Sequence, residues 1–344
     1  MKRFQFIILS AIIIVFFLCP APLLSYDEGV ANLLQKMGDE TLRSTYQGER
    51  YIFDFNSPEP KVTRYRIIHR KDGFEKKVII SLDNNKPRRI LLKDKENMWE
   101  YIPSQKKVIK MSADPAEDRT YTLLKNISLI KENYSITTID GIAVAGRDST
   151  LVEFIPKNNE KRPRYKIWSD KETGLALRTE VYNPENRLTL LSFFSKIEYT
   201  IPPAEENFVL RVPKNTSLKS VKARQNMELV SLESLVDFKT LLPKYLPKGF
   251  VIAGGRVKSY KTSKELHIHY SDGLSGISLF ENSSGKFYTQ KHKPVKSVDI
   301  NDVKGNFYQV GMIRILEWQS KGLTLALVGE IAEEEFLKIA RSIE

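Results

Sequence analysis

Residues 63–82, TRYRIIHRKDGFEKKVIISL, hold the pattern that decides the fold of this chain. Two runs rich in β-branched, aromatic and charged residues lie on either side of a turn signal at Asp72 and Gly73. A link this short joins neighbouring antiparallel strands, because parallel strands need a much longer crossover. The stretch therefore predicts a pair of antiparallel strands.

The same pattern of short β-branched, aromatic and charged runs separated by turn signals continues on both sides of this pair, from Tyr46 to Tyr199. We expect further strands at residues 48–55, 88–93, 98–102, 106–111, 134–139, 141–147, 149–155, 164–170, 175–183 and 187–199. Apolar residues at helical spacing predict only two helices here, at 30–43 and 117–130. This excess of strands over helices predicts a mainly β, α+β fold. We expect a curved antiparallel half-barrel whose concave face is covered by the helices or by a ligand.

A break in the strand pattern divides the chain. The stretch from Ile201 to Gln225 is rich in Pro, Lys, Ser and Asn, which is typical of a linker. After it we expect a helix at 231–242, several short strands and a closing helix at 332–343. We therefore predict a first domain at 26–212, a linker at 213–227 and a small C-terminal α+β domain at 228–344.

The N-terminus has the pattern of a signal peptide. Two basic residues precede an apolar run at 4–18, and two prolines follow it. We expect cleavage near Ser25, so that residues 1–25 are removed and the mature protein is exported. An uncleaved membrane anchor is the alternative, although the apolar run is shorter than the roughly 20 residues of a spanning helix.

The single cysteine, Cys19, lies inside this predicted signal peptide. A mature chain without it can form no disulfide, which export permits. If the protein were a lipoprotein, Cys19 would carry the lipid. Lipid-attachment sites have small residues just before the cysteine, whereas this chain has Phe17 and Leu18 there. We therefore do not expect anchoring at Cys19.

The chain is basic, with a formal net charge of +12. Outside the cytoplasm, basic chains attract lipid head groups, lipopolysaccharide or an acidic protein rather than nucleic acid. A solvated surface that keeps the protein soluble is the alternative explanation for this charge.

Known catalytic and nucleotide-binding motifs are missing from the sequence. The stretch 273–276 has Ile277 where a nucleophile elbow needs glycine, and no glycine-rich phosphate loop occurs. Glu265, His267 and His269 share one face of a predicted strand, but the chain has only four histidines in all, too few for a convincing metal site. We expect a solvated strand face there, no metal, no cofactor and no enzymatic activity.

An apolar ligand is the remaining possibility for the first domain. Apolar side chains on its predicted strands could line the concave face and hold an acyl chain, although ordinary core is the alternative for most of them. The candidate lipid-binding residues are Tyr51, Phe53, Ile67, Ile79, Leu91, Trp99, Tyr101, Phe154 and Ile167.

Several short motifs occur in a fixed order along the chain. They are TYQG at 45–48, VAGR at 144–147, WSDKETGL at 168–175, YLPKGF at 245–250, YSDGL at 270–274, and Leu279-Phe280. In these motifs and their order the sequence resembles the MucB/RseB family of periplasmic regulators of envelope-stress sigma factors.

The resemblance implies a LolA-like half-barrel that takes an acyl chain and a C-terminal domain that holds a protein partner. The implied partners are the periplasmic region of an anti-sigma factor, or another envelope protein, and the acyl chains of a lipid, lipoprotein or lipopolysaccharide. The expected function is a periplasmic lipid-sensing regulator of envelope-stress signalling. The alternative is a LolA-like periplasmic carrier of lipoproteins or lipids.

Overall fold

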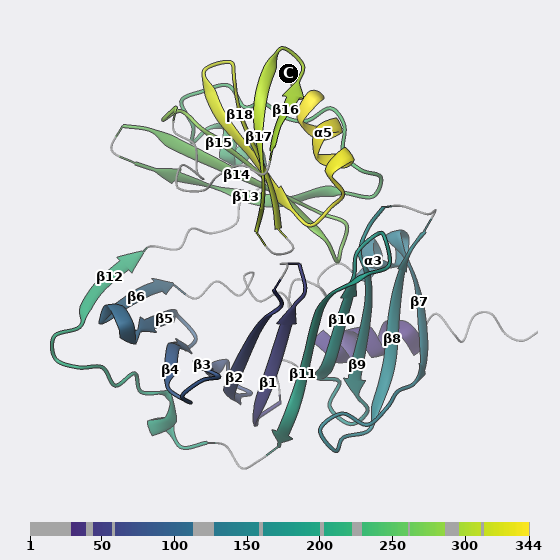
Figure 1. Cartoon of the computed structure of the whole chain (residues 1–344), viewed down its shortest axis with the longest axis vertical. Coiled ribbons are helices and arrows are strands. Elements are labelled where there is room, and N and C mark those ends of the chain that lie inside the picture. The colour runs from purple at the N-terminus through teal and green to yellow at the C-terminus, as the bar shows by residue number, and fades with distance from the viewer. Residues whose placement is uncertain are drawn as a thin grey trace, which may run out of the picture.

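The computed structural model describes residues 29–38, 44–56, 59–112, 127–157, 161–199, 203–221, 229–260, 262–285, 296–310 and 313–343, and places most of them in two sheets (Figure 1). The first sheet has twelve strands in the order β12-β6-β5-β4-β3-β2-β1-β11-β10-β9-β8-β7. Because β12 and β7 lie at opposite ends of this order, the curved sheet stays open. Its strands are β1 (Tyr46–Asp54), β2 (Lys61–Arg70), β3 (Phe74–Ile80), β4 (Pro87–Lys93), β5 (Asn97–Ile102), β6 (Lys107–Ser112), β7 (Tyr134–Asp140), β8 (Ser149–Pro156), β9 (Arg164–Asp170), β10 (Ala176–Tyr182), β11 (Leu188–Glu198) and β12 (Ser217–Val221).

The second sheet lies above the first in Figure 1 and has seven strands in the order β13-β14-β15-β19-β18-β17-β16. Its strands are β13 (Val251–Ser259), β14 (Lys264–Ser271), β15 (Gly276–Asn282), β16 (Lys296–Ile300), β17 (Val303–Val310), β18 (Ile313–Ser320) and β19 (Leu323–Gly329). The described helices are residues 29–38, α3 (Ile127–Asn133), α4 (Leu229–Glu233) and α5 (Glu333–Arg341), with 3-10 turns η1 (Pro103–Gln105) and η4 (Glu205–Phe208). The mainly β, α+β architecture predicted from the sequence is confirmed.

The stretch that decided the fold forms the β2–β3 hairpin. Arg70 pairs with Phe74 across the turn, and Gly73 adopts a left-handed φ of 94° that suits glycine. The remaining meander from β1 to β6 follows the predicted antiparallel pattern.

Two predicted elements are wrong in type or length. The expected strand at 141–147 is a tight turn closed by a Val144–Arg147 bridge, because Gly146 and the residue before it adopt left-handed φ angles. The helix expected at 231–242 ends already at Glu233. The hydroxyl of the next residue, Ser234, donates to the backbone carbonyl of Ser231.

Other predictions fall wholly or partly outside the described residues. The signal peptide, with Cys19 and the cleavage site near Ser25, lies among residues that the structure does not describe. The first predicted helix is described only over 29–38, and the second only from Ile127 onward.

The helix at 29–38 and α3 pack on one face of the first sheet, which we call the helix face. Their apolar side chains meet those of β7, β8 and β9. The buried members of this helix-face cluster are Val30, Leu34, Met37, Ile130, Tyr134, Val152, Phe154 and Ile167.

The opposite face of the first sheet is crossed by the chain itself, and we call it the crossing face. β11 lies in the middle of the sheet, whereas β12 pairs in parallel with β6 at its edge. Residues 203–216, the crossing segment, therefore pass over the strands between them, and Phe208 packs edge-on against Phe74 of β3. Part of the predicted linker is thus a strand of the first sheet, while the domain boundaries themselves stay a prediction.

Several ionisable groups are buried in the second sheet, and Glu281 is one of them. Glu281 on β15 is completely buried, and its carboxylate accepts hydrogen bonds from the backbone N–H of Leu241 at 3.1 and 3.2 Å. Burial outweighs this hydrogen bond and, helped by the charge of Glu233, raises the pKa of Glu281 from 4.5 to about 8. The carboxyl group is therefore mostly protonated at neutral pH.

This buried carboxyl group makes stability depend on pH. Because the folded pKa of Glu281 lies above its unfolded value, the free energy of unfolding falls as pH rises from about 4.5 to about 8. Glu281→Gln keeps an acceptor for Leu241 without the charge. We expect it to gain stability over the wild type by up to about 1.4 kcal/mol per pH unit in this window. Urea unfolding of both proteins across the window measures the difference, and a constant difference would contradict the account.

Candidate functional site

The nine candidate lipid-binding residues fall on both faces of the first sheet. The strand register places five of them on the helix face and four on the crossing face. The helix-face residues are Ile67, Ile79, Leu91, Phe154 and Ile167, and the crossing-face residues are Tyr51, Phe53, Trp99 and Tyr101. They do not line one shared cavity, because residues that alternate along a strand point to opposite faces.

Most of the helix-face candidates belong to the packed interior. Ile67, Phe154 and Ile167 are 3%, 2% and 6% exposed and lie in buried clusters with neighbouring strands and helices. Ile79 and Leu91 are half-buried. Ordinary core is therefore the better description of the first three.

A cavity opens on the crossing face, between the sheet and the crossing segment. Its volume is about 380 Å³. The sheet contributes Phe74, Leu92, Trp99 and Val108, and these are joined by residues of the crossing segment and β12, namely Phe208, Leu210, Val212, Thr216, Ser217 and Leu218. Lys93 and Asp94 add polar groups to the lining. Of the nine candidates only Trp99 lines this cavity. The other lining residues were not predicted, because the sequence does not reveal where the chain crosses the sheet.

A row of aromatic rings lies on the same face, over β1 and β11. Phe193 pairs across the strands with Tyr51, and the two ring centroids are 5.9 Å apart at an interplanar angle of 19°. Phe53 stacks with Phe193 at 6.0 Å and with Phe55 at 6.1 Å. Two of the predicted residues are thus brought together, alongside two aromatic residues that the sequence analysis missed.

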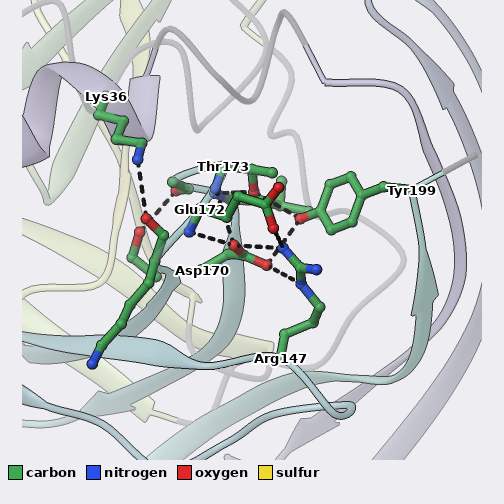
Figure 2. Close-up of polar contacts among 10 residues, drawn as sticks. Lys36, Arg147, Asp170, Glu172, Thr173 and Tyr199 are labelled. Carbon is green, nitrogen blue, oxygen red and sulfur yellow. Dashed lines mark hydrogen bonds and ion pairs between the residues drawn. The ribbon is translucent and has the colours of Figure 1, made fainter.

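A hydrogen-bond network around Asp170 fixes the turn between β9 and β10 (Figure 2). The buried Asp170 carboxylate accepts hydrogen bonds from Nε of Arg147 at 2.7 Å and from the backbone N–H groups of Glu172 and Thr173 at 2.9 and 3.0 Å. The hydroxyl of Tyr199 donates to it at 3.3 Å. Because these donors occupy the Asp170 carboxylate, its role in the network is structural.

The same turn holds the first helix against the sheet. Nζ of Lys36 donates to the backbone carbonyl of Lys171 at 3.0 Å, as Figure 2 shows. Gly174 has a φ of 82°, and a Cβ there would lie 3.0 Å from the Lys36 carbonyl oxygen. Two sequence motifs, at 144–147 and 168–175, therefore meet in space to brace the fold.

The pKa values in this network reflect its hydrogen bonds and burial. Burial alone would raise the pKa of Asp170, but the hydrogen bonds from Arg147 and the backbone outweigh it and hold that pKa below its ordinary value. Hydrogen bonds to Asp170 and Glu172 raise the pKa of Arg147, and burial raises that of Tyr199. Asp170 and Arg147 therefore both stay charged at neutral pH and can form an ion pair.

The histidine pair on β14 is half-buried, so the predicted solvated strand face is solvated only in part. The ring of His267 stacks on Phe280 at 4.3 Å, and its Nε2 lies 2.8 Å from the hydroxyl of Ser278. Burial lowers the pKa of His267 to about 3. Within the described ranges, no group of three or more His, Cys, Asp or Glu residues could hold a metal ion, and no helix is long and apolar enough to cross a membrane.

A buried polar junction joins the two sheets. The Asp272 carboxylate, on the turn between β14 and β15, lies 3.3 Å from the Arg162 guanidinium and accepts a hydrogen bond from the Tyr134 hydroxyl at 2.8 Å. These three side chains are nearly inaccessible to solvent. The side-chain amide of Asn133 donates to the backbone carbonyls of Gly249 and Asp272, both at 3.0 Å.

Close packing completes this junction. Gly273 has a φ of 101°, and a Cβ there would lie 2.7 Å from Cγ1 of Ile130 on α3. Leu274, next in the turn, packs against the helix-face cluster. Lys161 and Glu334 form an exposed ion pair across the two parts at 2.6 Å. The second sheet therefore completes part of the core of the first.

These features define a two-sheet protein with an open half-barrel, a cavity under a crossing segment and a buried junction between the sheets. The family model for the MucB/RseB N-terminal domain matches residues 29–214, and a model for a domain of unknown function, DUF4367, matches residues 240–343. The chain belongs to the MucB/RseB family.

Individual relatives match over most of their length. The sigma-E factor regulatory protein RseB of Haemophilus influenzae is 21% identical over 82% of this chain and 81% of its own. A chain of the Pseudomonas aeruginosa MucA/MucB complex is 17% identical with a TM-score of 0.61, and the match covers 92% of this chain and 98% of that one. A structure of MucB in complex with MucA(peri) gives a TM-score of 0.60 at 17% identity, over 91% and 98% of the two chains. The structural matches confirm the fold across both sheets.

The brace around Asp170 gives a direct test of stability. Arg147→Met leaves the Asp170 carboxylate buried without its counter-charge, so we expect the free energy of unfolding to fall by about 3 kcal/mol. The control Arg187→Met removes an exposed ion pair with Glu185, 3.8 Å long, and is expected to cost less than about 0.5 kcal/mol. Urea unfolding compares the two variants. Equally small losses would show that Asp170 does not brace the fold.

Proposed function

We propose that this protein is a non-enzymatic periplasmic regulator that binds the periplasmic region of an anti-sigma factor. Its membership of the MucB/RseB family is the observation that carries the proposal. A relative named as a sigma-E factor regulatory protein aligns over most of the chain, and MucB occurs in complex with MucA in two matching structures. These matches cover both sheets, which favours a function that needs both.

The cavity on the crossing face supports a second part of this proposal, the sensing of a lipid. Eight of its twelve lining residues are apolar or aromatic, namely Phe74, Leu92, Trp99, Val108, Phe208, Leu210, Val212 and Leu218. An acyl chain that enters it gains about 0.8 kcal/mol for each methylene removed from water.

A carrier of lipids or lipoproteins is the competing function, because such a carrier also needs an apolar cavity. The junction around Asp272 favours the regulator, since it buries part of the second sheet in the first and a simple carrier has no use for it. In a regulator, the bound lipid and the protein partner shift one equilibrium between arrangements of the two sheets.

Partner binding is tested by calorimetry with the full chain and the periplasmic region of an anti-sigma factor encoded beside it. We expect saturable binding that a lipid ligand weakens, because the two ligands favour different arrangements. Binding of the lipid with no binding of any neighbouring anti-sigma region would favour the carrier instead.

Lipid binding is tested with a fluorescent long-chain fatty acid. Leu210→Asp places a charge in the cavity, and we expect at least about a tenfold loss of affinity because a buried unpaired charge is costly. The control Ile139→Asp changes a side chain that is 63% exposed on β7, away from the cavity, and is expected to bind like the wild type. If both variants bind equally well, the cavity is not the lipid site.

A further inference from the structure

The β12 end of the first sheet carries an excess of positive charge. Six cations lie on or beside β6, on the crossing segment and on β12, namely Lys106, Lys107, Lys110, Arg211, Lys214 and Lys219. None of the six forms an ion pair with a carboxylate in the part of the chain that the structure describes. β6 and residues 209–221 contain no aspartate or glutamate. We call these six cations the basic edge.

Several cations on the neighbouring strands are instead paired with carboxylates. Arg64 on β2 pairs with Glu49 at 2.9 Å, and Arg89 on β4 pairs with Glu100 at 2.9 Å. At the basic edge, by contrast, like charges approach one another. Burial, together with the nearby charge of Arg211, lowers the pKa of Lys76 on β3. The positive charge of the basic edge is therefore not neutralised by ion pairs with described residues.

Exposed apolar side chains accompany these cations. Val209, Val212 and Leu218 are 52%, 37% and 66% exposed, and all three lie within the thirteen residues 209–221. β12 pairs with β6 on one side only and forms the end of the sheet opposite β7, far from α3 in Figure 1. Docking at this end leaves the junction between the sheets undisturbed.

We propose that the basic edge docks on the surface of an anionic lipid bilayer. Phosphate head groups attract the lysine and arginine side chains, while the aliphatic side chains reach the boundary between head groups and acyl chains. An acidic protein would satisfy the cations alone, whereas a bilayer satisfies both kinds of side chain. Because Val212 and Leu218 also line the cavity, docking brings the mouth of the cavity to the lipid.

This proposal goes beyond the binding of a partner or of a single lipid, and co-sedimentation of the full chain with vesicles tests it separately. We expect binding to vesicles of phosphatidylcholine with phosphatidylglycerol, weakening as salt rises, and little binding to phosphatidylcholine alone. Reversing two exposed charges, in the double variant Lys214→Glu and Lys219→Glu, should weaken binding at least about tenfold. Leu218→Asp should weaken it several-fold.

Three matched variants separate the basic edge from general effects. Lys304→Glu reverses an exposed charge in the second sheet, and Ile139→Asp changes an exposed apolar residue on β7, so both should bind anionic vesicles like the wild type. Leu210→Asn adds no charge beside Arg211, so it should weaken fatty-acid binding but keep the vesicles, which distinguishes docking from the cavity. The proposal is overturned if anionic vesicles do not bind, or if Lys304→Glu weakens binding as much as the double variant at the basic edge.

Discussion

The buried contact between Asp272 and Arg162 is the interaction on which the arrangement of the whole molecule depends. Both side chains are removed from water, so each charge needs the other and the Tyr134 hydroxyl to offset its desolvation. The turn that carries Asp272 also inserts Leu274 beside the helix-face cluster. Separation of the two sheets would expose apolar surface and leave the Asp272 and Arg162 side chains without their partners, so the junction opposes separation.

The order of strands in the first sheet explains why its two faces differ. The helices at 29–38 and α3 cover the helix face at its β7 end, so that region is packed core. The chain leaves β11 in the middle of the sheet and returns at β12, beyond β6, which obliges it to cross the opposite face. The cavity lies under this crossing. The cavity and a structural core thus occupy opposite faces of one sheet, with the basic edge at the end where the crossing finishes.

The sequence predicted the meander well and the site only in part, for physical reasons. A hairpin such as β2–β3 joins strands that are adjacent in the sequence, and the turn residue Gly73 allows it to be predicted. Alternation along a strand shows which residues share a face but not which face is covered, and both faces here are partly buried, so Trp99 and Ile167 were grouped although they point in opposite directions. Two partners of Asp272, Tyr134 and Arg162, lie more than a hundred residues away in the sequence, and no local pattern reveals such a contact. Its motif at 270–274 was recognised, but its role was not.

The yield of one cross-link tests most directly whether the junction holds the two sheets together. Lys161 and Glu334 form an exposed ion pair across them, so a zero-length carbodiimide reagent can join the amine and the carboxylate. We expect the wild-type chain to give the Lys161–Glu334 cross-linked peptide in mass spectrometry, and Asp272→Asn to lose most of it while both sheets stay folded. Equal yields from the wild type and a folded Asp272→Asn variant would contradict the account.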